Sequence, residues 1–194
     1  MSIPYVIEKG PGDQERSYDL YSRLLKDRVV FIKGVFDQEM ADAVVAQLLF
    51  LETMDSTEDI RMYINSPGGQ INAMYAIFDT MQYITPDIVT IGIGQCASAA
   101  SFILAGGTKG KRFALNNCMH MLHEFSSGAE GKFNDIKNSY DHMAKLYEKM
   151  AKNYVEFTGQ KLSKIKQCMQ RDFYMSSEEA KSFGLIDEVL YKRA

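Results

Sequence analysis

Ser98 is the residue of this sequence best placed to act as a nucleophile. It follows Ile88–Ile93, a short β-branched segment that predicts a buried strand, and it precedes Ala99–Ala105, which suits a helix. A hydroxyl at such a turn projects from the strand end, and the first N–H groups of the helix favour a developing oxyanion. The arrangement is similar to a nucleophile elbow. However, the sequence lacks G-x-S-x-G, and a serine here would serve equally as a helix N-cap.

A serine nucleophile needs a general base, and the sequence has three histidines. His142 lies in a polar, Lys-rich segment and is expected to be solvated. His120 and His123 are three positions apart on one predicted strand, so their side chains point to opposite faces. Only one of them can face Ser98, and position alone does not say which. Because no Cys, Asp or Glu cluster accompanies them, no metal site is expected.

The acid that would orient the histidine is also open. Four aspartates lie downstream of the histidine pair: Asp135, Asp141, Asp172 and Asp187. Asp172 is attractive because its neighbours Arg171 and Phe173-Tyr174 suggest a packed turn that excludes solvent. The residue types alone do not decide among the four.

Ser66-Pro67-Gly68-Gly69 ends another predicted strand. Consecutive glycines let the backbone approach a ligand closely and turn N–H groups toward it, although the same residues also form ordinary Pro-Gly turns. Beside a nucleophile on the neighbouring strand, this segment would supply half of an oxyanion hole. The N–H of Ala99 would supply the other half.

Composition narrows the class of protein. The chain has 194 residues, a net charge of −3 and three cysteines without C-x-x-C spacing. A nucleic-acid partner, a disulfide framework and a zinc site are therefore not expected, and a reducing cytoplasm fits best. Neither a signal peptide nor an apolar run of about 18 residues is present, so no membrane association is expected.

The predicted elements alternate as β-α-β-α-β-α with short links, which predicts parallel strands joined by right-handed crossovers. A long, polar helix over 133–157 is expected to project from the globule or to meet another subunit, and Gly159 is expected to end it. Residues 1–17 are expected to be mobile unless a partner orders them, and the whole of 1–194 is expected to form one domain. The predicted strands are 28–32, 59–65, 88–93, 112–115, 118–122 and 184–190; the predicted helices are 18–26, 38–53, 71–84, 99–105, 133–157, 162–170 and one begun by the capping box Ser176/Glu179.

Over nearly its whole length the sequence resembles the caseinolytic serine peptidases, the proteolytic (ClpP) subunits of Clp proteases. The motifs that carry the resemblance are Tyr18-Asp19-Leu20-Tyr21-Ser22-Arg23-Leu24-Leu25-Lys26, Tyr63-Ile64-Asn65-Ser66-Pro67-Gly68-Gly69, Gly94-Gln95-Cys96-Ala97-Ser98, Lys109-Gly110-Lys111-Arg112-Phe113, Met121-Leu122-His123, Thr158-Gly159-Gln160, and Glu179-Ala180 through Gly184-Leu185-Ile186-Asp187.

The resemblance implies a Ser-His-Asp catalytic triad of Ser98, His123 and Asp172, with the N–H groups of Gly69 and Ala99 as the oxyanion hole. It implies a crotonase-like α/β fold and a handle over about 126–158. Two stacked heptameric rings would enclose a chamber for unfolded polypeptides, and residues 1–17 would form axial loops. An AAA+ unfoldase would use the ATP, so this chain would need no cofactor. The expected substrate-binding residues are Phe125, Ser126, Ser127 and Gly128; the expected unfoldase-docking residues are Tyr63, Tyr83, Ile91, Ile93, Phe113, Leu115 and Leu190; the expected ring-ring contacts are Arg171 and Gln170.

The sequence departs from the family pattern at four places. Glu124-Phe125 stands where Gln-Pro is usual, and Ser127-Gly128 replaces Gly-Gly. Gln170 replaces the acid that usually precedes the arginine, and Arg61 replaces an aromatic of the docking surface. These departures suggest one alternative to a serine endopeptidase, a weakly active regulatory or structural ring subunit. A second alternative is an acyl-CoA enzyme of the crotonase superfamily, because a Gly-Gly oxyanion hole also suits a thioester enolate.

Overall fold

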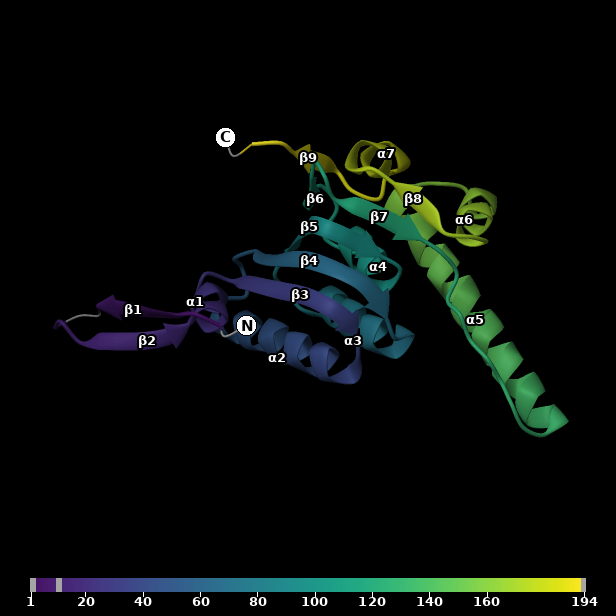
Figure 1. The fold of residues 1–194 in the computed structure, drawn as a ribbon, viewed down its shortest axis with the longest axis horizontal. Coiled ribbons are helices and arrows are strands. Elements are labelled where there is room, and N and C mark those ends of the chain that lie inside the picture. Colours follow the sequence, from purple (N-terminus) through teal and green to yellow (C-terminus); the bar gives the residue numbers. More distant parts are fainter. Residues whose placement is uncertain (1–2, 10–11, 193–194) are drawn as a thin grey trace.

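A mostly parallel sheet forms the centre of the structure (Figure 1). The computed structural model describes residues 3–9 and 12–192, and within them the sheet has seven strands. These strands are β3 (Val29–Phe36), β4 (Ile60–Gly69), β5 (Ile88–Ala97), β6 (Arg112–Leu115), β7 (Met119–Leu122), β8 (Phe173–Met175) and β9 (Glu188–Leu190). Parallel strands run in the order β3-β4-β5-β6-β9, while β7 pairs parallel with the end of β5, and β8 pairs antiparallel with β7.

Helices connect the strands and cover the sheet. They are α1 (Leu20–Lys26), α2 (Gln38–Met54), α3 (Ile71–Tyr83), α4 (Ala99–Ala105), α5 (Phe133–Thr158), α6 (Leu162–Met169) and α7 (Ser177–Phe183). The Asp37 carboxylate caps α2 by accepting the Met40 N–H at 2.8 Å. Alternate β4 residues Ile60, Met62 and Ile64 are fully buried in the core. The predicted β-α alternation with parallel strands is confirmed.

Three strands are longer than predicted: β3 continues to Phe36 instead of ending at position 32, and β4 and β5 also extend further. β4 continues to Gly69 instead of ending at position 65, and β5 continues to Ala97 instead of 93. Their pairing shifts register between Ile64 and Ser66, and Gly94 has φ of +65°, so each strand passes an irregularity and then resumes. Sequence periodicity ends at such an irregularity even though the strand does not.

The described part of residues 1–17, for which the sequence indicated no regular element, contains two strands. β1 (Tyr5–Lys9) and β2 (Glu15–Asp19) form an antiparallel hairpin that projects from the globule (Figure 1). Glu8 forms an ion pair with Arg23 of α1, which ties the hairpin to the first helix. Helix α1 begins at Leu20 because Asp19 is its N-cap, two residues later than predicted.

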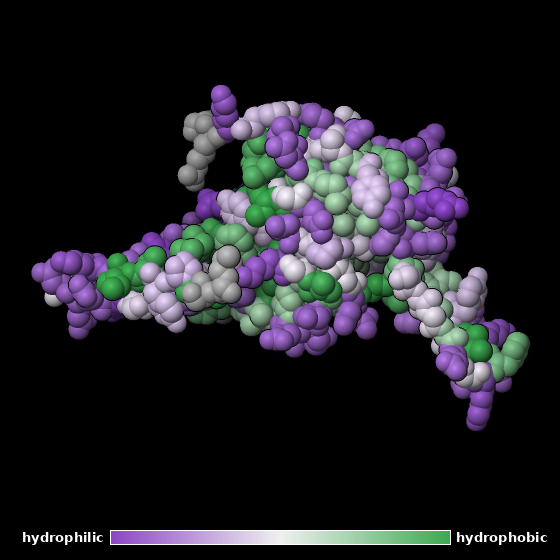
Figure 2. All heavy atoms as spheres, in the orientation of Figure 1, coloured by the Kyte–Doolittle hydropathy of each residue, from purple (hydrophilic) through white to green (hydrophobic). Residues whose placement is uncertain are grey.

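Helix α5 is the long helix that the sequence predicted. It spans 26 residues, and Gly159 ends it in a left-handed conformation. Only its C-terminal part is buried, at Met150, Ala151 and Tyr154, while its N-terminal part projects away from the sheet (Figure 1). Apolar side chains are exposed on both projecting arms (Figure 2): Ile3, Tyr5 and Ile7 on the N-terminal segment, and Phe133, Ile136 and Tyr140 on α5.

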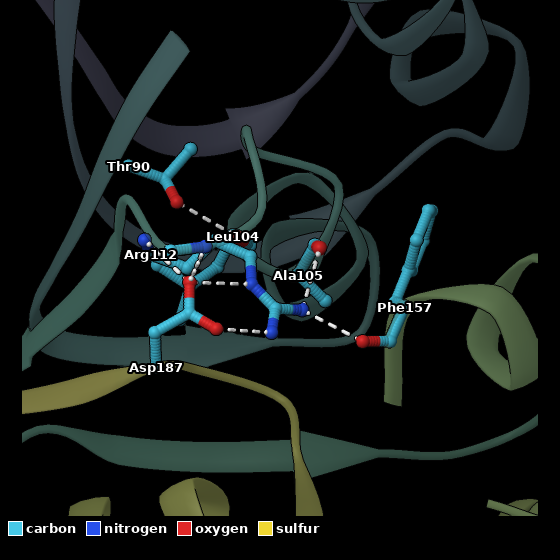
Figure 3. A network of polar contacts seen from close by, with 7 residues as sticks. Thr90, Leu104, Ala105, Arg112, Phe157 and Asp187 are labelled. Carbon is cyan, nitrogen blue, oxygen red and sulfur yellow. Dashed lines mark hydrogen bonds and ion pairs between the residues drawn. The ribbon is translucent and has the colours of Figure 1, made fainter. Parts of the chain in front are cut away.

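A buried ion pair joins the start of β6 to the residue before β9, its neighbouring strand (Figure 3). The Arg112 guanidinium donates to Asp187 at 2.6 and 3.0 Å, and also to the carbonyl oxygens of Ala105 and Phe157 at the ends of α4 and α5. Burial would raise the pKa of Asp187, but the hydrogen bonds and charge of Arg112 and the Gly110 N–H bring it below its usual value. This carboxylate therefore stabilises the fold while it is ionised.

Asp187→Asn is expected to lower the free energy of unfolding at pH 7 by about 2–4 kcal/mol, because it removes the charge that faces a buried guanidinium. Since the pKa of Asp187 is lowered in the folded state, its contribution is present above about pH 4 and is lost as the pH falls below that value. When urea unfolding is measured between pH 3 and 7, the free energy of unfolding should therefore fall less on acidification for the variant than for the wild type.

The matched control is Glu188→Gln, which breaks an ion pair with Lys181 whose side chains are 54% and 39% exposed. That change should leave the free energy of unfolding nearly unchanged, because solvent screens an exposed ion pair. Equal effects of the two substitutions would contradict the stabilising role assigned to Asp187.

Candidate active site

Ser98 lies between the end of β5 and the start of α4. Its backbone has φ of +56° and ψ of −120°, an unusual conformation for a residue other than glycine. Its N–H donates to the carbonyl oxygen of Met121 in β7 at 2.9 Å, which fixes the turn to the neighbouring strand. Ser98 is the N-cap residue of α4 by position, but its side chain makes no capping hydrogen bond.

Strand pairing brings His123 and Asp172 together. In the antiparallel pair of β7 and β8, Leu122 lies opposite Phe173, so the next residue of one strand faces the preceding residue of the other. The contact follows: His123 Nδ1 is 3.0 Å from Asp172 Oδ1. The Glu124 N–H also donates to the Met169 carbonyl oxygen at 2.7 Å, which holds the histidine segment against the end of α6.

The other candidate residues lie elsewhere. His120 is fully buried and contacts Ser177, on the opposite side of the strand from His123. Asp135 and Asp141 are exposed on α5, and Asp187 is paired with Arg112. Of the histidines and aspartates considered above, His123 and Asp172 are the ones that the described structure brings together.

The prediction of a packed, solvent-free turn around Asp172 is wrong. The side chain of Asp172 is 52% exposed, and its second oxygen accepts the hydroxyl of Tyr174 at 3.2 Å. This hydrogen bond to a carboxylate raises the pKa of Tyr174. Arg171 and Gln170 are exposed next to it, in the link between α6 and β8.

Gly68 and Gly69 bring β4 into close contact with the Ser98 turn. Their φ angles are +96° and +154°, and a Cβ on Gly68 would lie 2.7 Å from both Ala97 O and Ser98 Cβ. The Gly68 N–H already donates to Ser66 Oγ at 3.0 Å. Gly69 and Ala99, the first residue of α4, remain the candidate donors for an oxyanion hole.

A cleft of about 600 Å³ opens in front of Ser98 and His123. Its lining includes Pro67, Gly69, Gln70, Ile71, Asn72, Phe125, Ser126, Ser127, His142, Met143 and Leu146. Gly128 does not take part in this lining. The α5 residues His142, Met143 and Leu146 were not expected there, because the sequence gives no sign of how a helix packs across an extended segment.

The predicted docking residues fall into separate groups. Tyr63, Ile91 and Phe113 occupy one register row across β4, β5 and β6, and Phe31 of β3 extends that row by stacking on Tyr63 at 5.5 Å. Ile93 follows two residues after Ile91 on β5, and Leu115 pairs with Leu190. Tyr83, 81% exposed, lies at the end of α3 and outside this row.

No metal or membrane feature accompanies the cleft. Across residues 3–9 and 12–192, no three His, Cys, Asp or Glu side chains are grouped so that they could bind a metal ion. None of the helices in this part of the chain combines the length and the apolar character needed to cross a bilayer. The chemistry that the cleft supports is nucleophilic catalysis by a hydroxyl beside an imidazole-carboxylate pair.

Comparison with known proteins agrees with this chemistry. Residues 12–193 match the family model described as Clp protease. The chain is 49% identical over 189 residues to the ATP-dependent Clp protease proteolytic subunit 2 of Bacillus licheniformis, and the match covers 97% of this chain and 99% of that protein.

Gly68→Ala is expected to lower kcat/KM for a fluorogenic peptide by roughly 100-fold, because the added methyl would displace the Ser98 turn. Gly128→Ala is the control for stability, since a Cβ there has no atom within 4 Å. The control should change the free energy of unfolding by less than about 0.5 kcal/mol. If the Gly68→Ala variant kept the kcat/KM of the wild type, the close contact between Gly68 and the Ser98 turn would be contradicted.

Tyr174→Phe is expected to lower kcat/KM by about 2- to 10-fold, because Asp172 loses one of its two hydrogen-bond partners and holds His123 less firmly. Tyr191→Phe is the matched control, since Tyr191 donates to Glu178, a carboxylate outside the cleft. Equal kcat/KM for wild type and Tyr174→Phe would show that the tyrosine does not position the carboxylate.

Proposed function

The chain belongs to the Clp protease family as a proteolytic subunit with serine peptidase activity, and we propose that Ser98, His123 and Asp172 hydrolyse the peptide bond. The observation that carries this proposal is the strand-held pair of His123 and Asp172 in the same cleft wall as Ser98. Asp172 accepts the Nδ1–H of His123, which leaves Nε2 to take the serine proton.

The reaction then proceeds by acyl transfer. Ser98 Oγ attacks the peptide carbonyl carbon as His123 takes its proton, and the N–H groups of Gly69 and Ala99 stabilise the oxyanion. His123 returns the proton to the leaving amine, and water hydrolyses the acyl-enzyme. Among the described residues no hydrogen bond joins Ser98 to His123, and we expect that bond to form when substrate closes the cleft.

The walls of the cleft support an extended polypeptide as substrate. Phe125–Gly128 forms neither helix nor strand and has free backbone groups, so it is suited to pair with a substrate strand. Ile71, Phe125, Met143 and Leu146 supply apolar contacts that need no particular sequence. Unfolded chains are therefore the substrate class.

The proposal also covers how the subunits assemble and which partner protein they bind. The exposed apolar residues on both arms support contacts with further subunits, as expected for two stacked heptameric rings joined through the handle, about 126–158. Residues 1–17 form the axial loops, and the single domain 1–194 has the crotonase-like fold. A cytoplasmic AAA+ unfoldase docks on the apolar row of β4 to β6 and uses the ATP.

Ser98→Ala is expected to abolish peptide hydrolysis while leaving the oligomer and the free energy of unfolding unchanged. The substitution removes one oxygen from an open cleft and no atom from the core. Peptide turnover and light scattering measure the two effects. Residual turnover above background would assign the nucleophile to another residue, and loss of the oligomer would give Ser98 a structural role.

A further inference from the structure

Two of the three cysteines lie in contact near the candidate active site. Cys96 is in β5, two residues before Ser98, and Cys118 directly precedes β7. Their Sγ atoms are 3.9 Å apart, and the residues are 0% and 2% exposed. A Cβ on Gly92 would lie 3.1 and 3.2 Å from the two sulfur atoms, so the glycine leaves the space that both thiols occupy.

His120 and Ser177 complete a group that we call the thiol cluster: Cys96, Cys118, His120 and Ser177. Ser177 Oγ donates its proton to the Leu115 carbonyl oxygen at 2.7 Å, so it accepts from His120 Nε2–H at 3.3 Å. His120 Nδ1 is then an acceptor, and this buried atom has no hydrogen-bond partner among the described residues.

The two thiols differ in acidity. A hydrogen bond with Cys96 lowers the pKa of the Cys118 thiol, burial opposes this effect, and His120 lowers the pKa further. The hydrogen bond with Cys118 and burial both raise the pKa of the Cys96 thiol. One sulfur is therefore suited to react as a thiolate and the other to remain a protonated thiol.

Cys118 is the cysteine of the pair that lies beside a surface pocket. Cys118 lines a surface pocket of about 420 Å³ together with Asn116, Asn117, Met119 and Tyr174. Cys96 does not line that pocket and lies behind Cys118. Of the two cysteines, Cys118 is therefore the one closer to an oxidant held in that pocket.

We propose that Cys118 and Cys96 form a reversible disulfide when the protein meets a hydroperoxide. The Cys118 thiolate attacks the peroxide, the O–O bond breaks, and Cys118 becomes a sulfenic acid. Cys96 then attacks that sulfur, a disulfide forms and water leaves. Overall, two thiols lose two electrons and two protons, and hydrogen peroxide becomes two waters. A dithiol reductant reverses the step.

Disulfide formation acts on the strands that carry the proposed catalytic residues. The sulfur atoms must approach from 3.9 Å to about 2.05 Å, which draws β5 and the start of β7 together. Ser98 lies two residues beyond Cys96, just past the end of β5, and His123 lies five residues beyond Cys118, just past the end of the paired strand β7. The oxidised protein is therefore expected to hydrolyse peptide substrates more slowly.

The test treats the full chain with hydrogen peroxide, blocks free thiols and maps tryptic peptides without reduction. We expect one cross-linked species that joins the Cys96 and Cys118 peptides, about 2 Da lighter than their sum, and that separates with dithiothreitol. Peptide hydrolysis should fall by roughly tenfold and recover with the reductant. Peptides that remain unlinked would overturn the proposal whatever the activity does, because mapping does not depend on the proposed triad.

Three variants sharpen the result. Cys168→Ser removes the third cysteine, which lies in α6, and should form the same cross-link as the wild type. Cys118→Ser should show neither cross-link nor peroxide-dependent loss of activity. Cys96→Ala should leave a sulfenic acid on Cys118 that dimedone traps. A cross-link that includes Cys168, or dimedone trapped only on Cys96, would contradict the assigned roles.

Discussion

The pairing of three short strand segments sets the geometry of the candidate active site. β7 pairs with the end of β5 on one side, which holds the Ser98 N–H to Met121, and with β8 on the other, which faces His123 toward Asp172. Three residues from distant parts of the chain are thus placed by backbone hydrogen bonds and not by their own side chains. A one-residue shift in the register of β7 would exchange the faces on which His120 and His123 lie, and His123 would no longer contact Asp172.

Two further sets of contacts constrain the site: the packing of Gly68 against the Ser98 turn, and the hydrogen bonds of Arg112 to the ends of two helices. Gly68 has no room for a side chain against Ser98, and the positive φ of Ser98 holds its hydroxyl toward the cleft. Far from the cleft, Arg112 joins the ends of α4 and α5, the two helices that carry Ala99 and the cleft residues Met143 and Leu146. The chemistry of the cleft therefore also depends on a buried contact that holds the C-terminal ends of these two helices together.

Much of the fold could be predicted from the sequence, because local signals agree with tertiary structure over α2, α3, α5 and the central strands. The hairpin β1–β2 and the three-residue strand β8 were not predicted, because these short segments become strands only through the strands with which they pair. The periodicity could not choose between His120 and His123, because both lie on one short strand; register with β8 separates them. The exposure of Asp172 and the approach of His142 to the cleft arise only from packing between distant segments.

The most direct test of the account is the rate at which a fluorophosphonate labels the protein, followed by intact mass and peptide mapping. The account predicts one adduct per chain, on Ser98, and labelling slowed by roughly 100-fold or more in Asp172→Asn, because the neutral amide holds His123 in the wrong tautomer. An adduct on another residue, or equal rates for wild type and Asp172→Asn, would contradict the assignment of Ser98, His123 and Asp172 as the catalytic residues.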